Sequence, residues 1–220
     1  MIVGKKKDIE DIKKMLSSSK KVLICGCDTC VSVCWAGGQK EVNELAAELE
    51  KDPDMAGINF IRSSVDRQCE AEMCEVLRPQ AEGADTILSM ACGAGAQVMA
   101  RLYEDKPVKP ALDTTFLGIP TELGTWVENC RCCGNCTIDL TGGICPVVGC
   151  AKGLLNGPCG GVRRGGKCEV DAEKDCIWVQ IYNRLEKQDR LDSITAIREP
   201  RDHSAVTRPG IVKAPLIDKV

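Results

Sequence analysis

The chain has 220 residues, and its 29 Lys and Arg against 32 Asp and Glu give a net charge of −3. That balance provides no positive field for nucleic acid, and an aromatic content of 3% leaves few rings for base stacking. We therefore exclude nucleic-acid binding, and we take the 16 cysteines as the most informative feature of the composition.

The N-terminal segment contains Lys5, Lys6 and Lys7 but lacks the apolar core of a secretory signal. We also find no apolar run of about 18 residues that would cross a bilayer. We therefore expect a cytoplasmic protein without a membrane span. In that compartment cysteines stay reduced or bind metal, so a disulfide framework is excluded.

Residues 1–120 are expected to form an α/β domain. The lysine-rich residues 1–21 are interpreted as a solvated helix face, with Ile9, Ile12 and Leu16 on its apolar side. Short apolar runs predict strands at 22–24, 57–61, 86–90 and 110–112. Helical periodicity predicts helices over 42–49, over 69–77 and up to Gly83, and over 98–102. This alternation indicates a Rossmann/flavodoxin-like parallel sheet covered on both faces.

Residues 121–190 are expected to form a second, irregular domain. Residues 130–176 hold ten glycines, nine cysteines and no aromatic residue. Such a segment buries too little apolar surface to offset its conformational entropy, about 1–2 kcal/mol per residue. Metal coordination can supply the difference, so we predict a Cys/Gly-rich metal-binding domain. A helix over 177–185 closes it, and residues 191–220 are predicted to be an extended tail, either disordered or wrapped around a partner.

A first cysteine site is predicted at the carboxyl end of the sheet, where ligands collect in parallel α/β folds. We expect the first and third strands to be neighbours in the sheet. The candidate metal ligands of this site follow those two strands and are Cys27, Cys30, Cys34 and Cys92. Cys69 is a rival for the fourth position and is otherwise interpreted as a core residue on a helix face. Gly93 would bring its N–H close to the sulfur atoms, and Cys25 and Cys74 are interpreted as core residues.

A second group of candidate ligands comprises Cys130, Cys133, Cys136, Cys145, Cys150, Cys159, Cys168 and Cys176. The first three have the x2, x2 spacing of bacterial ferredoxins, and Cys145-Pro146 matches their Cys-Pro, although eight residues rather than three precede it. With Cys132 set aside, eight thiols suffice for two four-thiolate sites or for one site with spares. The spacing and the paired glycines favour iron–sulfur clusters, and zinc is the alternative.

The sequence offers no catalytic residues. His203 is the only histidine and lies in the tail, so no Cys–His nucleophile pair is evident beside either cysteine group. A thioredoxin-like dithiol at Cys27 and Cys30 is also considered, but such a dithiol does not call for the further cysteine at 34.

The motifs resemble the C-terminal domain family of methylenetetrahydrofolate reductase, which has small stand-alone iron–sulfur members in acetogenic anaerobic bacteria. The resemblance rests on the Cys130–Cys136 run, on Asn156-Gly157-Pro158-Cys159-Gly160-Gly161, and on the segments around Cys27 and Cys92. Within the Asn156–Gly161 signature, Gly157, Gly160 and Gly161 are expected to allow close approach to a cofactor.

The resemblance implies a non-catalytic redox subunit in the Wood–Ljungdahl pathway. Such a subunit carries two or three [4Fe–4S] clusters, with zinc as an alternative at one site. Its partner is a flavin-containing catalytic subunit, with FMN on that partner and not on this chain. Ferredoxin, or an NADH-dependent or heterodisulfide-reductase-like subunit, would supply the electrons.

Overall fold

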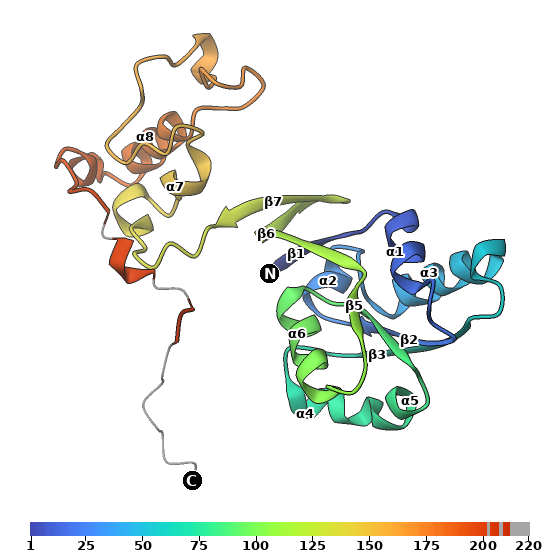
Figure 1. Cartoon of the computed structure of the whole chain (residues 1–220). Helices are drawn as coiled ribbons and strands as arrows, with labels where there is room; N and C mark the ends of the chain where they lie inside the picture. The colour runs from blue at the N-terminus through green and yellow to red at the C-terminus, as the bar shows by residue number, and fades with distance from the viewer. Residues whose placement is uncertain (202, 207–208, 212–220) are drawn as a thin grey trace. The chain divides into compact units, whose positions relative to one another are not determined.

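The computed structural model describes residues 1–201, 203–206 and 209–211. The chain divides into two compact units, Met1–Glu128 and Asn129–Val220, which are described separately (Figure 1). In the described residues, no helix is long and apolar enough to cross a membrane.

A four-stranded parallel sheet forms the centre of the first unit. Its order is β3 (Asn59–Val65), β2 (Lys21–Cys27), β4 (Thr86–Met90) and β5 (Val108–Pro110). The parallel sheet is therefore confirmed, and so is the expectation that the first and third predicted strands are neighbours, since Val22 pairs with Thr86. The two central strands β2 and β4 were predictable because both of their faces are buried, which makes each a nearly continuous run of apolar or small residues.

Two hydrophobic clusters cover the two faces of this sheet. Because side chains alternate along a strand, Val22 and Ile24 of β2 join one cluster while Leu23 and Cys25 join the other. The first cluster includes residues of α1 (Ile9–Leu16) and α3 (Gln39–Lys51), and the second includes residues of α5 (Arg78–Glu82) and α6 (Gly93–Leu102). Cys25 and Cys74 are both fully buried, as predicted.

The segment after β3 differs from the prediction. Instead of one helix from residue 69, the chain forms α4 (Ala71–Cys74), a 3₁₀ turn (Glu75–Leu77) and α5. Pro79, at the start of α5, lacks the N–H that a continuous helix would need at this position. Cys69 precedes α4 and is exposed, so its interpretation as a core residue on a helix face was wrong.

A second sheet has the order β1 (Ile2–Lys6), β6 (Leu112–Glu122) and β7 (Thr125–Cys130), and β1 pairs antiparallel with β6. Figure 1 shows β1 beside β6, although the two strands are far apart in the sequence. The sequence analysis predicted a helix face for residues 1–21, and only α1 is helical there. The predicted fourth strand also divides between β5 and the start of β6.

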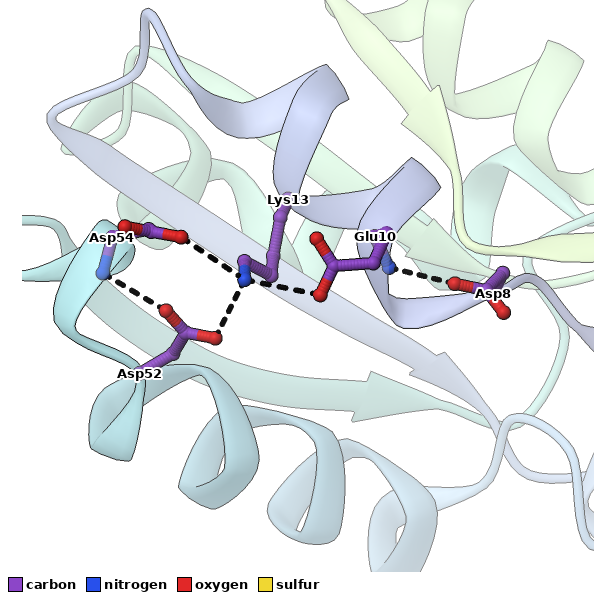
Figure 2. Close-up of polar contacts among 5 residues, drawn as sticks. All are labelled: Asp8, Glu10, Lys13, Asp52 and Asp54. Carbon is purple, nitrogen blue, oxygen red and sulfur yellow. Dashed lines mark hydrogen bonds and ion pairs between the residues drawn. The ribbon is translucent and has the colours of Figure 1, made fainter.

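Lys13 of α1 is not a solvated lysine, because only 9% of its surface is exposed. Its ammonium group lies 2.8 Å from a carboxylate oxygen of Asp52, 3.1 Å from Glu10 and 3.3 Å from Asp54 (Figure 2). Asp8 caps α1 by accepting from the Glu10 backbone N–H. The acidic turn after α3 thus anchors α1 through one lysine.

The second unit is built around α8 (Ile177–Lys187), which confirms the predicted closing helix. Its buried side chains Trp178, Ile181 and Leu185 form a small core with Cys176. The other elements are α7 (Pro146–Gly149) and short 3₁₀ turns at Ile138–Thr141, Arg164–Gly166, Leu191–Ile194 and His203–Ala205. Leu191 and Ile194 of the predicted tail pack against this core, whereas residues 202, 207–208 and 212–220 lie outside the described residues.

Candidate cysteine metal sites

Cys27 is the last residue of β2, and a network of main-chain hydrogen bonds fixes the loop that follows it. The Cys27 N–H donates to the Gly37 carbonyl at 2.8 Å, and the Asp28 N–H donates to the Val65 carbonyl at 2.9 Å. The Asp28 carboxylate accepts from the Gln39 N–H at 2.7 Å, at the start of α3. These hydrogen bonds therefore define the conformation of the loop after Cys27.

Cys30 opens the short helix α2 (Cys30–Val33), and Cys34 follows it. The Cys34 sulfur lies among backbone groups, 3.4 Å from the Gly4 nitrogen and 3.5 Å from the Val31 oxygen. Burial raises the pKa of the Cys34 thiol, and the nearby Cys30 adds to that shift. A thiol with a raised pKa is not an activated nucleophile, which weighs against thiol–disulfide chemistry at Cys34.

Cys69 and Cys92 lie close to Cys27. Burial raises the pKa of Cys69, and the negative charges that Cys27 and Cys92 would carry as thiolates raise it further. Cys92 caps the N-terminus of α6 and packs with Cys27 and Cys34 in one apolar cluster. The structure therefore brings Cys69 and Cys92 to the same end of the sheet as Cys27, and it does not separate the two rivals for the fourth ligand.

Gln68 positions the backbone next to Cys69, and the sequence analysis missed it. Its side chain is fully buried, and its Nε2 donates to the carbonyls of Cys25 at 2.7 Å and Gly26 at 2.9 Å. Its Oε1 accepts from the Ser89 hydroxyl at 2.6 Å. Gln68 thus joins the loop after β3 to both β2 and β4. A single buried glutamine has no periodicity, so the sequence carried no signal for it.

Gly93 was predicted to turn its N–H toward sulfur. In the structure that N–H donates to the Thr114 hydroxyl at 2.8 Å, on β6. A role for Gly93 beside a cofactor would therefore require Thr114 to release it.

In the second unit, one pocket is lined by Cys150, Cys159, Cys168 and Cys176. Helix α8 contributes one wall, with Ile177 and Trp178, and the Trp178 indole N–H donates to the Leu154 carbonyl at 3.2 Å. The free space between these groups is about 20 Å³, roughly the volume of one water-sized sphere. Four cysteines from separate turns therefore line one small cavity.

Short hydrogen-bonded turns position two of these cysteines. The Cys168 N–H donates to the Lys174 carbonyl at 2.8 Å, and the Cys176 N–H donates to the Gly166 carbonyl at 2.7 Å. Isolated antiparallel bridges join Lys167 to Arg163 and to Asp175.

A carboxylate lies beside the second cysteine of this pocket, Cys159. The Cys159 sulfur is 3.2 Å from Oε2 of Glu169, and Glu169 forms an ion pair with Lys152. The hydrogen bond from Lys152 lowers the pKa of the Glu169 carboxyl, and the same contact raises the pKa of Lys152. The Glu169 carboxylate therefore accepts a hydrogen bond from the Cys159 thiol and forms an ion pair with Lys152.

The turn that carries Cys159 depends on its glycines. Gly157 and Gly160 have φ angles of 100° and 79°, in the left-handed region that favours glycine. At Gly161 an added Cβ would lie 2.2 Å from the Glu169 carboxylate. These predicted cofactor-contacting glycines thus shape the loop beside Cys159 and Glu169.

The remaining cysteines of the second unit do not line this pocket. Cys130 ends β7, and its sulfur accepts from the Cys132 N–H at 3.4 Å. Cys132 has a φ of 51° and is exposed, as are Cys130 and Cys136. The Cys133 carbonyl accepts from Arg201, and Cys145 caps the N-terminus of α7. The structure thus groups four cysteines of the second unit around one pocket and leaves its other cysteines outside that pocket.

Within the described residues, no three His, Cys, Asp or Glu side chains lie close enough together to hold a metal ion as they stand. The donor set of the pocket nevertheless fits a thiophilic metal, because all four cysteines face one cavity whose other walls are largely apolar. Small shifts of these side chains would have to accompany binding.

The chain was compared with known proteins. Residues 109–204 match the family described as methylene-tetrahydrofolate reductase C terminal. Neither the curated proteins nor the solved structures include one that matches the chain.

Proposed function

Since residues 109–204 belong to the methylene-tetrahydrofolate reductase C-terminal family, we propose that this chain is the iron–sulfur electron-transfer subunit of a heteromeric methylenetetrahydrofolate reductase. It would relay electrons to the flavin of a catalytic partner that forms methyltetrahydrofolate. A bound [4Fe–4S] cluster supplies one-electron redox chemistry for this role. The proposed role is non-catalytic.

The observation that carries the proposal is how the cysteines are grouped. Cys27 ends β2, while Cys69 and Cys92 follow its parallel neighbours β3 and β4, so all three lie at the carboxyl end of the sheet. Cys150, Cys159, Cys168 and Cys176 line one pocket. Of the eight candidate ligands in residues 130–176, the four that do not line this pocket are Cys130, Cys133, Cys136 and Cys145. We assign this remaining set, with its ferredoxin-like spacing, to a [4Fe–4S] cluster.

The pocket itself supports a second candidate role, that of a zinc-stapled interaction module. Its free space of about 20 Å³ suits one ion better than a cluster with four irons and four sulfides. We therefore assign zinc to Cys150, Cys159, Cys168 and Cys176. If every site held zinc, the chain would scaffold the complex without carrying electrons.

The test is anaerobic purification of the full chain with iron, acid-labile sulfide and zinc measured on the same sample. We expect iron and sulfide in equal amounts together with about one zinc. Cys133→Ser should lower iron and keep zinc, Cys168→Ser should remove zinc and keep iron, and Cys132→Ser is the matched control that keeps both. EPR after reduction should show a cluster signal that Cys133→Ser weakens.

Turnover of the reconstituted complex then separates relay from scaffold. Cys27→Ser and Cys133→Ser should stop ferredoxin-driven reduction of methylenetetrahydrofolate. Dye-linked oxidation of methyltetrahydrofolate, performed at the partner's flavin, should continue. A chain that contains zinc and no iron, or iron loss without loss of ferredoxin-linked turnover, would refute the relay.

A further inference from the structure

A second cavity in the Asn129–Val220 unit has a volume of about 330 Å³. It lies between the 135–155 segment and residues 198–201. Aliphatic side chains, including Leu140, Val147 and Leu155, form one part of its wall, and two arginines, Arg198 and Arg201, form another. This volume is at the lower end of the range of small-molecule sites, which are mostly apolar with a few polar anchors.

Arg198 is held from both sides. Its Nη1 donates to the Thr137 hydroxyl at 2.9 Å, and its backbone N–H and C=O bond the Asn156 side-chain amide at 2.8 and 3.1 Å. Its other terminal nitrogen, Nη2, is buried and has no hydrogen-bond partner in the described part of the chain. The Arg198 guanidinium is thus held in place while its Nη2 makes no hydrogen bond among the described residues.

Arg201 repeats this arrangement on the same cavity. Its Nη2 donates to the Cys133 carbonyl at 3.2 Å. Its Nε is buried, and it too lacks a partner among residues 1–201, 203–206 and 209–211. Buried donors without acceptors are rare because each costs the free energy of its lost hydration. Two of them, both on charged guanidinium groups lining one cavity, indicate a missing acceptor.

We propose that this cavity binds a small organic oxyanion. A carboxylate or phosphate group would accept from Arg198 and Arg201, which suit such groups because guanidinium donors are planar and permanently charged. The apolar part of the ligand would pack against Leu140, Val147 and Leu155. Glu199 also lines the cavity but is exposed, so the two arginines dominate its charge.

This site is separate from the metal chemistry proposed above, since none of the cavity's described lining residues is a cysteine. It adjoins that chemistry where Arg201 donates to the carbonyl of Cys133 and where its lining residues Asn135 and Thr137 flank Cys136. Failure of either proposal would therefore leave the other standing.

The experiment is isothermal titration of the full, metal-loaded chain with three probes: inorganic phosphate, phenyl phosphate and phenylacetate. The two aryl probes distinguish a phosphate from a carboxylate ligand, and inorganic phosphate measures the anion without an apolar body. We expect one aryl probe to bind at one site per chain and more tightly than inorganic phosphate.

Arginine variants locate the binding. Arg201→Gln and Arg198→Gln should each weaken the tighter aryl probe about tenfold or more, the loss that a charged hydrogen bond implies. The matched control is Arg190→Gln, which removes the same charge from an arginine that donates to the Asp139 carbonyl and does not line the cavity. The affinity of the Arg190→Gln variant for the tighter aryl probe should stay within about twofold of that of the unchanged chain.

A third variant covers the case in which Arg198→Gln disturbs the loop around Asn156. Leu155→Phe keeps both arginines and fills part of the cavity, so it should weaken the aryl probes far more than inorganic phosphate. The proposal is overturned if no probe binds, or if the variants at 198 and 201 bind as the Arg190→Gln control does.

Discussion

Ser89 on β4 donates its hydroxyl hydrogen to Oε1 of Gln68 at 2.6 Å, and the same amide donates through Nε2 to two carbonyls of β2. One buried side chain therefore connects two neighbouring strands to the loop that carries Cys69. All three of these contacts are inside the first unit and away from solvent.

We expect Gln68→Ala to destabilise the protein, because it leaves the Ser89 hydroxyl and backbone carbonyls without a buried partner. The loss in free energy of unfolding should be about 1–3 kcal/mol. Urea unfolding followed by circular dichroism measures it. Gln97→Ala is the matched control, since Gln97 is exposed on α6, and it should change stability by less than about 0.5 kcal/mol. Equal effects from both variants would contradict the role assigned to Gln68.

The cluster around Lys13 predicts a pH dependence. The hydrogen bond from Lys13 lowers the pKa of Asp52 below its ordinary value of 3.8. Its stabilising contribution is therefore present above pH of about 4 and is lost as the pH falls through the lower, folded-state pKa. Asp52 raises the pKa of Lys13, so the contribution of the lysine persists at neutral pH and is lost only in strong alkali.

The corresponding test compares Lys13→Met with the unchanged protein by thermal unfolding at several pH values. The difference in Tm should be largest near pH 7 and should shrink as the pH falls through the lowered folded-state pKa of Asp52. Lys40→Met is the matched control, because Lys40 forms an exposed pair with Glu44 at 3.7 Å. A Tm difference that does not change between pH 7 and pH 3 would show that the ion pairs contribute little.

Thiol reactivity should follow burial. Burial raises the pKa of Cys74 to about 11 and that of Cys25 further, so both are protonated at pH 8. With iodoacetamide at that pH, the folded metal-loaded protein should leave both unmodified, and unfolding should expose them. Cys132 is exposed and outside the proposed ligand sets, so it should react first. Protection of Cys132 to the same degree as Cys133 would make Cys132 a ligand. Peptide mass spectrometry measures all of these.

Metal removal should affect the two units differently. A structural zinc site contributes about 10–16 kcal/mol of apparent binding free energy, and the core around α8 is small. A zinc chelator should therefore increase hydrogen exchange in α8 and in residues 150–176. Exchange in β2 and α3 should hardly change, because their core consists of packed aliphatic side chains. If the amides of α8 stay protected from hydrogen exchange after zinc is removed, the zinc site does not stabilise the second unit.

The parallel sheet could be predicted from the sequence because burial on both faces makes runs such as Thr86–Met90 uniformly apolar or small. The antiparallel sheet could not. In β1 only Val3 and Gly4 are buried, and most residues of β6 are exposed, so neither strand has a strong apolar pattern. These strands are defined by their pairing with each other across more than a hundred residues of sequence.

The candidate sites show the same division. Cysteine spacing was sufficient to nominate ligands, and Cys25 and Cys74 were correctly placed in the core. Spacing could not show that four of the eight thiols in the second group line one pocket, because that depends on how turns between residues 150 and 176 fold back on α8. Nor could it reveal Gln68 or the two arginines of the anion cavity. Polar residues acquire such roles only from what tertiary structure places around them.

The pairing of β1 with β6 also has a consequence for how the chain is made. Ile2 leaves the ribosome well before its partner Leu117, which is synthesised after the last strand of the parallel sheet. At synthesis rates of about 5–20 residues per second, the backbone N–H and C=O groups of β1 remain without their β6 partners for several seconds. The N-terminal lysines Lys5 and Lys6 lie on that edge strand, where charge discourages pairing with other nascent chains. The same dependence means that residues 109–204 would lose a partner strand if expressed alone, so the segment that matches the family and the folding unit have different boundaries.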